Sequence, residues 1–470
     1  MASEQDWTDI GQRMDNQTAT RFYWSLTMMA TLGGFLFGYD TANIGSDLNF
    51  VPYHLAPWAL GYLLAGASLG AAFGAMAAGP LTDRFGRKSF LVINAAVYAA
   101  GAILSAFTID ATMLLLARTL VGLAVGADSA IATAYIAEYA PKGRRGTLGI
   151  LQQWMITIGI LVAYIIAIII FSIWPHQAYT VDWRVILGLG AVPALIGLLF
   201  RVRMPESPRW LMEQGRWDRL QSVLSTLGIQ VSQSELQQAA QHQPKTEKRS
   251  RLTPGVKRAL VIAGVFMIFQ QITGINVAFY YGPKVLLPYF SSAHMTAVMA
   301  AVRGTEATLG LAAVNVAATY IGFRSIDTYG RKGLARLGYG GMAFFMLIAA
   351  MVLGLSGMTR AIAILVALAG FITFFAFGVG GTGWIIEGEY FPTEVRGRAS
   401  STVAFINWMA NFAIVEIFPA LMKQIGLGGV MVLFAILAVL ATVFVSGWLP
   451  ETKGLSLEEI SSQFEREATR

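Results

Sequence analysis

Long apolar stretches alternate with short polar turns along almost the whole chain. Windows such as 58–80, 156–174 and 430–448 contain no charged residue. Each of them approaches the roughly 20 apolar residues that span a lipid bilayer. Counting such stretches gives twelve, so the pattern predicts an all-α integral membrane protein with twelve transmembrane helices.

The polar turns occur twice, about 245 residues apart. Three separate patterns recur in the same order: Asp83-Arg-Phe-Gly-Arg-Lys88 as Asp327-Thr-Tyr-Gly-Arg-Lys332, Glu138-x-x-Pro-x-x-x-Arg145 as Glu389-x-x-Pro-x-x-x-Arg396, and Pro205-Glu-Ser as Pro450-Glu-Thr. Agreement among the three shifts is hard to obtain by chance. The chain is therefore predicted to be an internal duplication, as in transporters that are built from two parallel halves.

This duplication divides the chain into five segments. We expect a cytoplasmic N-terminal tail at 1–21, a six-helix bundle at 22–204, a cytoplasmic linker at 205–252, a second six-helix bundle at 253–449 and a cytoplasmic C-terminal tail at 450–470. The linker is rich in Gln, Ser, Glu and Lys, with short amphipathic patches. It is predicted to contain short surface helices that join the two halves.

Composition supports a membrane protein. Hydrophobic residues make up 55% of the chain and charged residues only 13%, against about 25% charged residues in a soluble domain. Glycine is abundant, with 49 residues, as expected where transmembrane helices approach closely. Cysteine is absent, which excludes a disulfide framework and a thiolate metal site.

The net charge of +7 reflects topology. With the amino terminus inside, all but six of the 34 Lys and Arg residues fall on cytoplasmic tails, loops or helix ends, the exceptions being Arg118, Arg184, Lys284, Arg303, Arg360 and Lys423. This distribution follows the positive-inside rule, and an even number of spans returns the carboxyl terminus to the cytoplasm. We therefore expect a multi-pass protein of the cell membrane rather than a nucleic-acid-binding protein. The first span lacks a cleavage signal and is expected to be retained.

The repeated charged turns form a candidate cytoplasmic latch, which would stabilise one conformation and open in another. Its members are charged residues and turn glycines, in two sets: Asp83, Arg84, Gly86, Arg87, Glu138 and Arg145, then Asp327, Gly330, Arg331, Glu389 and Arg396. Carboxylates in such turns can cap a helix or accept hydrogen bonds from arginine. The alternative is ordinary loop polarity with charges that only set orientation.

Several motifs carry a family resemblance over nearly the whole length. They are Gly33-Gly-Phe-Leu-Phe-Gly-Tyr-Asp40, the two Asp…Gly-Arg-Lys turns, Arg118 with Gly122 and Gly126, Pro205-Glu-Ser-Pro-Arg209, Gln270-Gln-Ile-Thr-Gly-Ile-Asn276 and Pro450-Glu-Thr-Lys-Gly454. Together they resemble the sugar porter family of the major facilitator superfamily. The resemblance implies two six-helix bundles that rock about a central site to give alternating access.

Asp40 lies well inside the first span, where a carboxylate is costly unless it is paired. Arg118, inside the fourth span, is its candidate partner. An acid held this way can change protonation when a conformational change alters its distance to the arginine. In the family that this chain resembles, an acid at this place accompanies proton symport, so we expect Asp40 and Arg118 to couple transport to protons. The alternative is a static ion pair.

Amide side chains inside apolar spans form a candidate polyol site, because Gln and Asn both donate and accept hydrogen bonds, as sugar hydroxyls do. The amides are Gln153, Gln270, Gln271, Asn276, Asn315 and Asn407, with Asn411 nearby, and Trp384 and Trp408 offer flat faces. The resemblance adds Phe37, Tyr280 and Gly380. Gly274 is expected to let the backbone open beside Asn276. For any single amide, the alternative is a hydrogen-bonded link between helices.

Some residues depart from the family pattern. The tenth span reads Gly380-Gly-Thr-Gly-Trp384 and lacks the proline that is usual in the family. Without the ring that forms a kink, gating by this helix is in doubt. Ile160 stands where a second glutamine is common. Four further acids lie in or near spans: Asp47, Asp128, Glu387 and Glu416. They could bind a cation or an amine, or face water at helix ends, the second interpretation being favoured for Asp47 and Glu416.

The function predicted from these features is import of a monosaccharide, pentose or hexose, by proton symport through alternating access. The alternatives are a proton-coupled carrier of a polyol, organic cation or aromatic acid, a facilitative uniporter, and a membrane sugar sensor. An enzyme is not expected, because the chain has no phosphate-binding loop motif, no metal-ligand spacing among its four His and no nucleophile–base pair. No cofactor or metal is expected. A monomer should suffice, since each pair of bundles encloses its own cavity.

Overall fold

The computed structural model describes residues 10, 13, 14, 16, 21–140, 145–241, 253–292 and 294–469, apart from the side chains at 57, 137, 145, 146, 238, 240, 241, 393 and 394. Within these ranges every regular element is a helix. Ten helical stretches are long and apolar enough to cross a membrane. One of these stretches contains two helices that meet at Gly426, whose backbone is not helical (φ 66°, ψ 174°), so the ten stretches contain eleven spans. The first span, which is split at Thr31, is not among them and brings the number to the predicted twelve.

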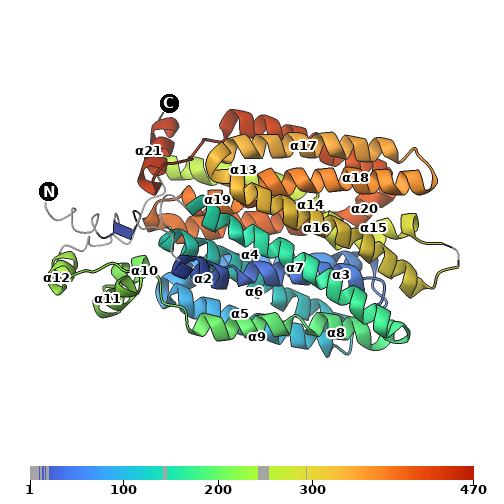
Figure 1. Ribbon diagram of the computed structural model, residues 1–470, viewed down its shortest axis with the longest axis horizontal. Helices are drawn as coiled ribbons and strands as arrows, with labels where there is room; N and C mark the ends of the chain where they lie inside the picture. Colours follow the sequence, from blue (N-terminus) through green and yellow to red (C-terminus); the bar gives the residue numbers. More distant parts are fainter. Residues whose placement is uncertain are drawn as a thin grey trace.

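The N-terminal half contains six spans. They are α2 (Arg21–Ala30) with α3 (Leu32–Asp47), α4 (Pro57–Phe85), α5 (Arg87–Ala106), α6 (Ala111–Tyr139), α7 (Arg145–Ile173), and α8 (Trp183–Gly188) with α9 (Ala191–Val202), preceded by the short turns η2 (Pro175–Gln177) and η3 (Ala178–Asp182). These helices form one layer of the molecule, drawn in blue to green in Figure 1.

The C-terminal half forms the second layer, drawn in yellow to red. It contains α13 (Pro254–Ile272), α14 (Ile275–Tyr280), α15 (Gly282–Phe290), α16 (Ala297–Tyr329), α17 (Arg331–Val352), α18 (Gly357–Phe374), η4 (Phe375–Gly380), α19 (Gly381–Glu389) and α20 (Thr393–Trp448). The two layers pack mainly through α4 against α20 and through α7 against α16. The fold is therefore the predicted pair of six-helix bundles.

Short helices gather at one end of the bundles (Figure 1). Three lie in the linker, α10 (Pro208–Glu213), α11 (Trp217–Thr226) and α12 (Gln233–Gln241); linker residues 242–252 lie outside the described part. A fourth, α21 (Leu457–Ala468), occupies the C-terminal tail and was not predicted from the sequence. Phe464 of α21 packs on Tyr390, with ring centroids 4.9 Å apart, and thereby fastens the tail to the second bundle.

Glycines allow two backbones to approach each other closely within the first bundle. A Cβ on Gly126 of α6 would lie 1.8 Å from the carbonyl oxygen of Ala71 in α4, and one on Gly38 of α3 would lie 1.9 Å from that of Ile156 in α7. No side chain fits in either space, because both obstacles are backbone atoms. The second contact brings α3, with Asp40, against the helix that carries Gln153.

Candidate functional site

A cavity lies between the two bundles near the middle of the spans. The empty space between its lining atoms is about 450 Å³, a figure that includes open solvent. Nine of the predicted site residues line it: Phe37, Gln153, Gln270, Gln271, Asn276, Asn315, Trp384, Asn407 and Trp408. They come from both halves of the chain, as a central site in an alternating-access carrier requires.

Gln271 is the centre of the hydrogen-bond network on the C-terminal side of the cavity. Its amide nitrogen donates to Asn407 Oδ1 at 2.7 Å and to Gln270 Oε1 at 3.2 Å, and its oxygen accepts from Asn276 Nδ2 at 2.7 Å. The Gln270 amide nitrogen donates to the carbonyls of residues 379 and 380, at 3.2 and 3.3 Å. These contacts fix four amides in one arrangement at the cavity wall.

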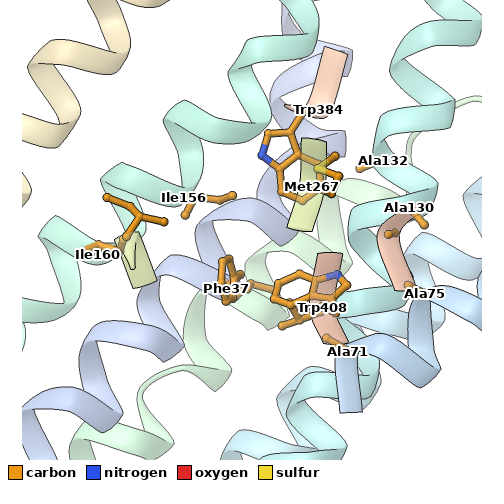
Figure 2. Close-up of a cluster of buried hydrophobic side chains, with 14 of the residues drawn as sticks. Phe37, Ala71, Ala75, Ala130, Ala132, Ile156, Ile160, Met267, Trp384 and Trp408 are labelled. Carbon is orange, nitrogen blue, oxygen red and sulfur yellow. The ribbon is translucent and has the colours of Figure 1, made fainter. Parts of the chain in front are cut away.

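Two tryptophans link the bundles across the cavity. Trp384 Nε1 donates to Gln153 Oε1 at 3.0 Å, and Trp408 Nε1 donates to Ser129 Oγ at 3.1 Å. Phe37 meets the Trp408 ring edge to face, with centroids 4.7 Å apart. Figure 2 shows the two indoles and Phe37 facing the same space, with Ile156 and Ile160 beside them. The aromatic rings supply apolar faces next to the amide edges.

Some polar atoms at the cavity lack protein partners. Asn315 Oδ1 and both amide atoms of Asn411 are buried without a hydrogen bond to the described residues. Buried polar groups are costly when they are left unsatisfied. A ligand with several hydroxyl groups can both donate to Oδ1 and accept from Nδ2. Among the described residues that line the cavity, none is charged. This lining favours a neutral polar ligand.

Breaks in the helices surround this cavity. Gly274 adopts φ +93° between α13 and α14, as expected, and so places Asn276 beside Gln271. The tenth span, which has no proline at the family position, is interrupted instead by the π-turn η4 just before Trp384. A π-turn inserts an extra residue and bends the helix. This span is therefore irregular even though it lacks the proline.

Two residues predicted at the site lie outside the cavity lining. Tyr280 is fully buried and its hydroxyl accepts a 3.4 Å hydrogen bond from Thr41 Oγ1. Gly380 lies behind the wall, where an added Cβ would come within 3.0 Å of Gln153 Cδ. The apolar lining residues Ile156, Ile160, Ile275, Phe279 and Phe375 were not predicted. Their positions resemble ordinary core, so the sequence offers no signal that distinguishes them.

Asp40 and Arg118 form a buried, two-pronged ion pair one helical turn from Phe37. The Arg118 Nη1 group donates to Asp40 Oδ1, and Nη2 donates to Asp40 Oδ2 at 2.9 Å. Arg118 Nε also donates to the carbonyl of Leu63 at 3.3 Å. The side chains are 6% and 1% exposed. The predicted pairing is present; its role in coupling remains a prediction.

The cavity is covered at both ends by contacts between the bundles. On the side of α14, Tyr164 Oη donates to the carbonyl of Phe279 at 2.5 Å. At the opposite end, Thr147 Oγ1 donates to Asp327 Oδ2, and an added Cβ on Gly397 would lie 3.0 Å from Asp83 Oδ1. The two bundles are thus in contact at both ends of the cavity in this structure.

The candidate latch has the same geometry in each bundle. Arg87 pairs with Glu138 at 3.1 Å and with Asp83 at 3.2 Å. In the second half, Arg331 pairs with Glu389 at 2.9 Å and with Asp327 at 3.2 Å. The turn glycines have φ +97° at Gly86 and +80° at Gly330.

The remaining predicted latch residues make other contacts. Arg84 stacks over the Phe85 ring at 5.2 Å, and the Arg396 Nε group donates to the carbonyl of Phe391 at 3.1 Å. The side chain of Arg145 lies outside the described residues.

Glu206 and Glu451 also belong to the latch. The sequence showed the repeated motifs that contain them but did not indicate that they contact the latch. Glu206 Oε1 accepts from the backbone N–H groups of Arg87 and Lys88 at 2.9 and 3.1 Å. Glu451 accepts from those of Arg331 and Lys332 at 2.9 and 3.1 Å. Each carboxylate therefore caps the first turn of the helix that begins at the latch arginine, where the helix dipole favours negative charge.

Two acids of the linker side have raised pKa values. Burial raises the pKa of Glu206 despite the backbone N–H groups that it accepts from. Partial burial, followed by repulsion from Glu138, raises the pKa of Glu213 to about 7, although part of this side chain is exposed to solvent.

We expect Glu206→Gln and Glu451→Gln each to lower the free energy of unfolding by about 1–2 kcal/mol, because the amide keeps the shape but loses the charge at the helix terminus. Thermal unfolding of purified protein in detergent measures the change. Glu306→Gln is the control, since Glu306 forms an exposed ion pair with Arg303 and exposed pairs contribute little. Equal stability of all four proteins would contradict the capping role.

The four further acids lie in different surroundings. The interpretation that Asp47 faces water at a helix end is wrong, because Asp47 is completely buried. Glu416 is half-buried against Gly61, within the helical stretch before Gly426. Asp128 is buried in an ion pair with Arg201. Glu387 is completely buried, and neither carboxylate oxygen has a hydrogen-bond partner in the described part of the chain.

Comparison with known proteins gives consistent results. Residues 26–464 match the family model described as "Sugar (and other) transporter". The arabinose-proton symporter of Bacillus subtilis (strain 168) is 34% identical over 448 residues, covering 93% of both chains. The D-xylose transporter of Levilactobacillus brevis is 34% identical over 440 residues, 92% of this chain and 93% of the relative. The proton:xylose symporter XylE, solved bound to 6-bromo-6-deoxy-D-glucose, superimposes with a TM-score of 0.80 at 28% identity, covering 95% of this chain and 99% of that one.

Proposed function

The chain belongs to the family of sugar (and other) transporters, and we propose that it imports a monosaccharide, pentose or hexose, together with a proton. Relatives of similar length are named as an arabinose-proton symporter and a D-xylose transporter. The family consists of transporters, in agreement with the prediction that the chain is not an enzyme. The observation that carries the proposal is the uncharged, amide-lined cavity directly beside a buried Asp–Arg pair.

The cavity chemistry fits a neutral polyol better than the alternative solutes. Amides that are fixed in one plane can match the alternating donors and acceptors of a sugar ring, and indole faces can pack on its C–H groups. An organic cation or an aromatic acid would need an opposite charge at the wall, since a buried charge without a partner is costly. Such a charge is absent from the lining residues that the structure describes.

The transport cycle follows from the two ends of the cavity. With the outer contacts open, sugar binds the amides while Asp40 takes up a proton from outside and its bond to Arg118 weakens. Closure around the sugar gives the state described above. The contacts of the latch acids between the bundles, Asp327 with Thr147 and Asp83 beside Gly397, then separate, the cavity opens inward, and sugar and proton leave. The Asp40–Arg118 pair re-forms and favours return of the empty carrier.

The latch end of the molecule is assigned to the cytoplasm by its positive charges. In that orientation α10–α12 and α21 lie in the cytoplasm of a protein in the cell membrane, with both termini inside. Each pair of bundles encloses one complete cavity, so a monomer is sufficient for transport. Partners are therefore the sugar, protons and the lipid bilayer.

Uptake into sealed proteoliposomes tests this function. Purified protein should accumulate labelled pentose or hexose when the outside is made more acidic than the inside, and a protonophore should abolish accumulation but not downhill entry. Labelled inositol and an organic cation serve as comparison solutes. Protein-free liposomes provide the background. If no carbohydrate enters at any external pH, or if only the cation enters, the proposed function is wrong.

A further inference from the structure

Two carboxylates that the transport cycle does not use are buried together at the outer end of the first bundle. Asp47 ends α3, and Asp182 ends η3, just before α8. Both residues are 0% exposed. None of their four carboxylate oxygens has a hydrogen-bond partner among the residues that the structure describes. Asp47 lies in electrostatic range of Asp182 and of Arg118.

Two further unsatisfied oxygens belong to the same helix. The Tyr39 hydroxyl lies near the Asn43 amide and within electrostatic range of Asp47, and Tyr39 Oη and Asn43 Oδ1 lack a hydrogen bond of ordinary geometry to the described residues. Tyr39 is 1% exposed and Asn43 is 2% exposed. The Asn43 nitrogen donates to the carbonyl of Ile186 in α8 at 3.1 Å, which holds the two helices together.

The charges around this cluster do not balance. The charged or titratable groups in range of Asp47 are Arg118 of α6, Asp182 of η3 and Tyr39 of α3. Arg118 is the only cation among them, and it already binds both oxygens of Asp40. A buried carboxylate without a counter-ion is costly. Asp47 lies one turn beyond Asn43, and Asp182 lies one turn before Ile186, which accepts from Asn43. Two buried acids within electrostatic range of each other are expected to share a proton, as paired acids in other proteins do.

We propose that Asp47 and Asp182 form a second proton-binding site, which takes a proton from the outer solution and supplies it to Asp40. The site rests on the proposed function, because it loads the acid that couples transport. Asp40, Asn43 and Asp47 lie on one face of α3, with Asp40 and Asp47 about 10 Å apart along the helix axis. Tyr39 is in range of Asp47, and Tyr98 is in range of both Tyr39 and Asp40.

The proton balance is as follows. An outer hydronium ion gives its proton to a carboxylate oxygen of the Asp47–Asp182 pair and becomes water. The O–H bond at the pair then breaks and one forms at an oxygen of Asp40. Asp40 becomes neutral and releases Arg118. Arg118 can then compensate the charge of Asp47. The total charge of the cluster does not change in this internal step, because the proton stays within the cluster.

Uptake measured against external pH tests the site. Initial rates of sugar uptake into proteoliposomes are recorded from about pH 5.5 to pH 8 for wild type, Asp47→Asn, Asp182→Asn and the double variant, at fixed internal pH. We expect the double variant to lose about tenfold in rate at the alkaline end and little at the acidic end, because direct loading of Asp40 suffices where protons are abundant. Glu306→Gln is the control for removal of an outer acid.

Equilibrium exchange of sugar, which needs no net proton movement, shows whether each variant is folded and binds sugar. Preserved exchange together with the alkaline loss supports the site. A pH profile identical to wild type overturns it, and so does an equal loss at every pH. A wild-type rate that depends on external Na⁺, tested by replacement with choline, assigns the cluster to a metal cation and also overturns the proposal. Absence of uptake by the wild type would instead refute the proposed function.

Discussion

Replacement of Asp40 by asparagine is expected to abolish accumulation of sugar while leaving downhill entry. Asparagine keeps the shape of the side chain but cannot carry a proton. For one proton per sugar, a difference of one pH unit supplies about 1.4 kcal/mol and supports about tenfold accumulation. In Asp40→Asn the internal sugar concentration should rise only to the external one. The measurement is the steady-state ratio of labelled sugar in proteoliposomes with an imposed pH gradient.

Asp128→Asn is a matched control for this experiment. Asp128 and Arg201 form a buried ion pair of the same two-pronged kind in the same bundle, and neither lines the cavity. Either substitution leaves a buried arginine without its carboxylate, at a cost of about 3–5 kcal/mol. Both variants should therefore unfold at a lower temperature, but only Asp40→Asn should lose accumulation.

Two results would contradict a coupling role for Asp40. Undiminished accumulation in Asp40→Asn would make the Asp40–Arg118 pair a static link between helices. Equal loss of accumulation in Asp128→Asn would show that a buried arginine without its partner is enough to stop transport.

The membrane fold was predictable because its main signals are local. Twelve apolar stretches and the duplicated turns set the number and the order of the helices without any knowledge of contacts. The Asp40–Arg118 pair was predictable for a related reason: charges inside spans are few, so a lone acid has few possible partners. Amides inside apolar stretches likewise stood out, and most of them line the cavity.

Other features depend on packing that the sequence does not display. Tyr280 was placed at the site by resemblance, yet its hydroxyl turns toward Thr41. Asp47 was expected to face water because it ends a helix, but it is completely buried. The helix α21 follows a polar tail pattern, and only the contact with Tyr390 shows which of its faces is buried. Each of these outcomes is decided by residues distant in sequence.

Replacement of Gln271 by leucine is expected to weaken sugar binding by about 10- to 100-fold. Leucine has a similar volume but removes one acceptor and two donated hydrogen bonds, to Gln270 and Asn407. The Asn276 and Asn407 amides then lose both a partner and their fixed orientation, and each unsatisfied buried group costs about 1–3 kcal/mol. The affinity for sugar should fall, because a site that hydrogen-bonds hydroxyl groups depends on every amide being held in place.

The measurement is KM for uptake together with Kd from calorimetry, and the accumulation ratio at saturating sugar should remain that of wild type because Asp40 is untouched. Asn94→Leu is the control: Asn94 is a buried amide of α5 that lies outside the cavity lining. This variant should keep the wild-type KM whatever its stability. Unchanged affinity in Gln271→Leu would mean that the amide network only holds helices together, and the sugar would then have to bind elsewhere between the bundles.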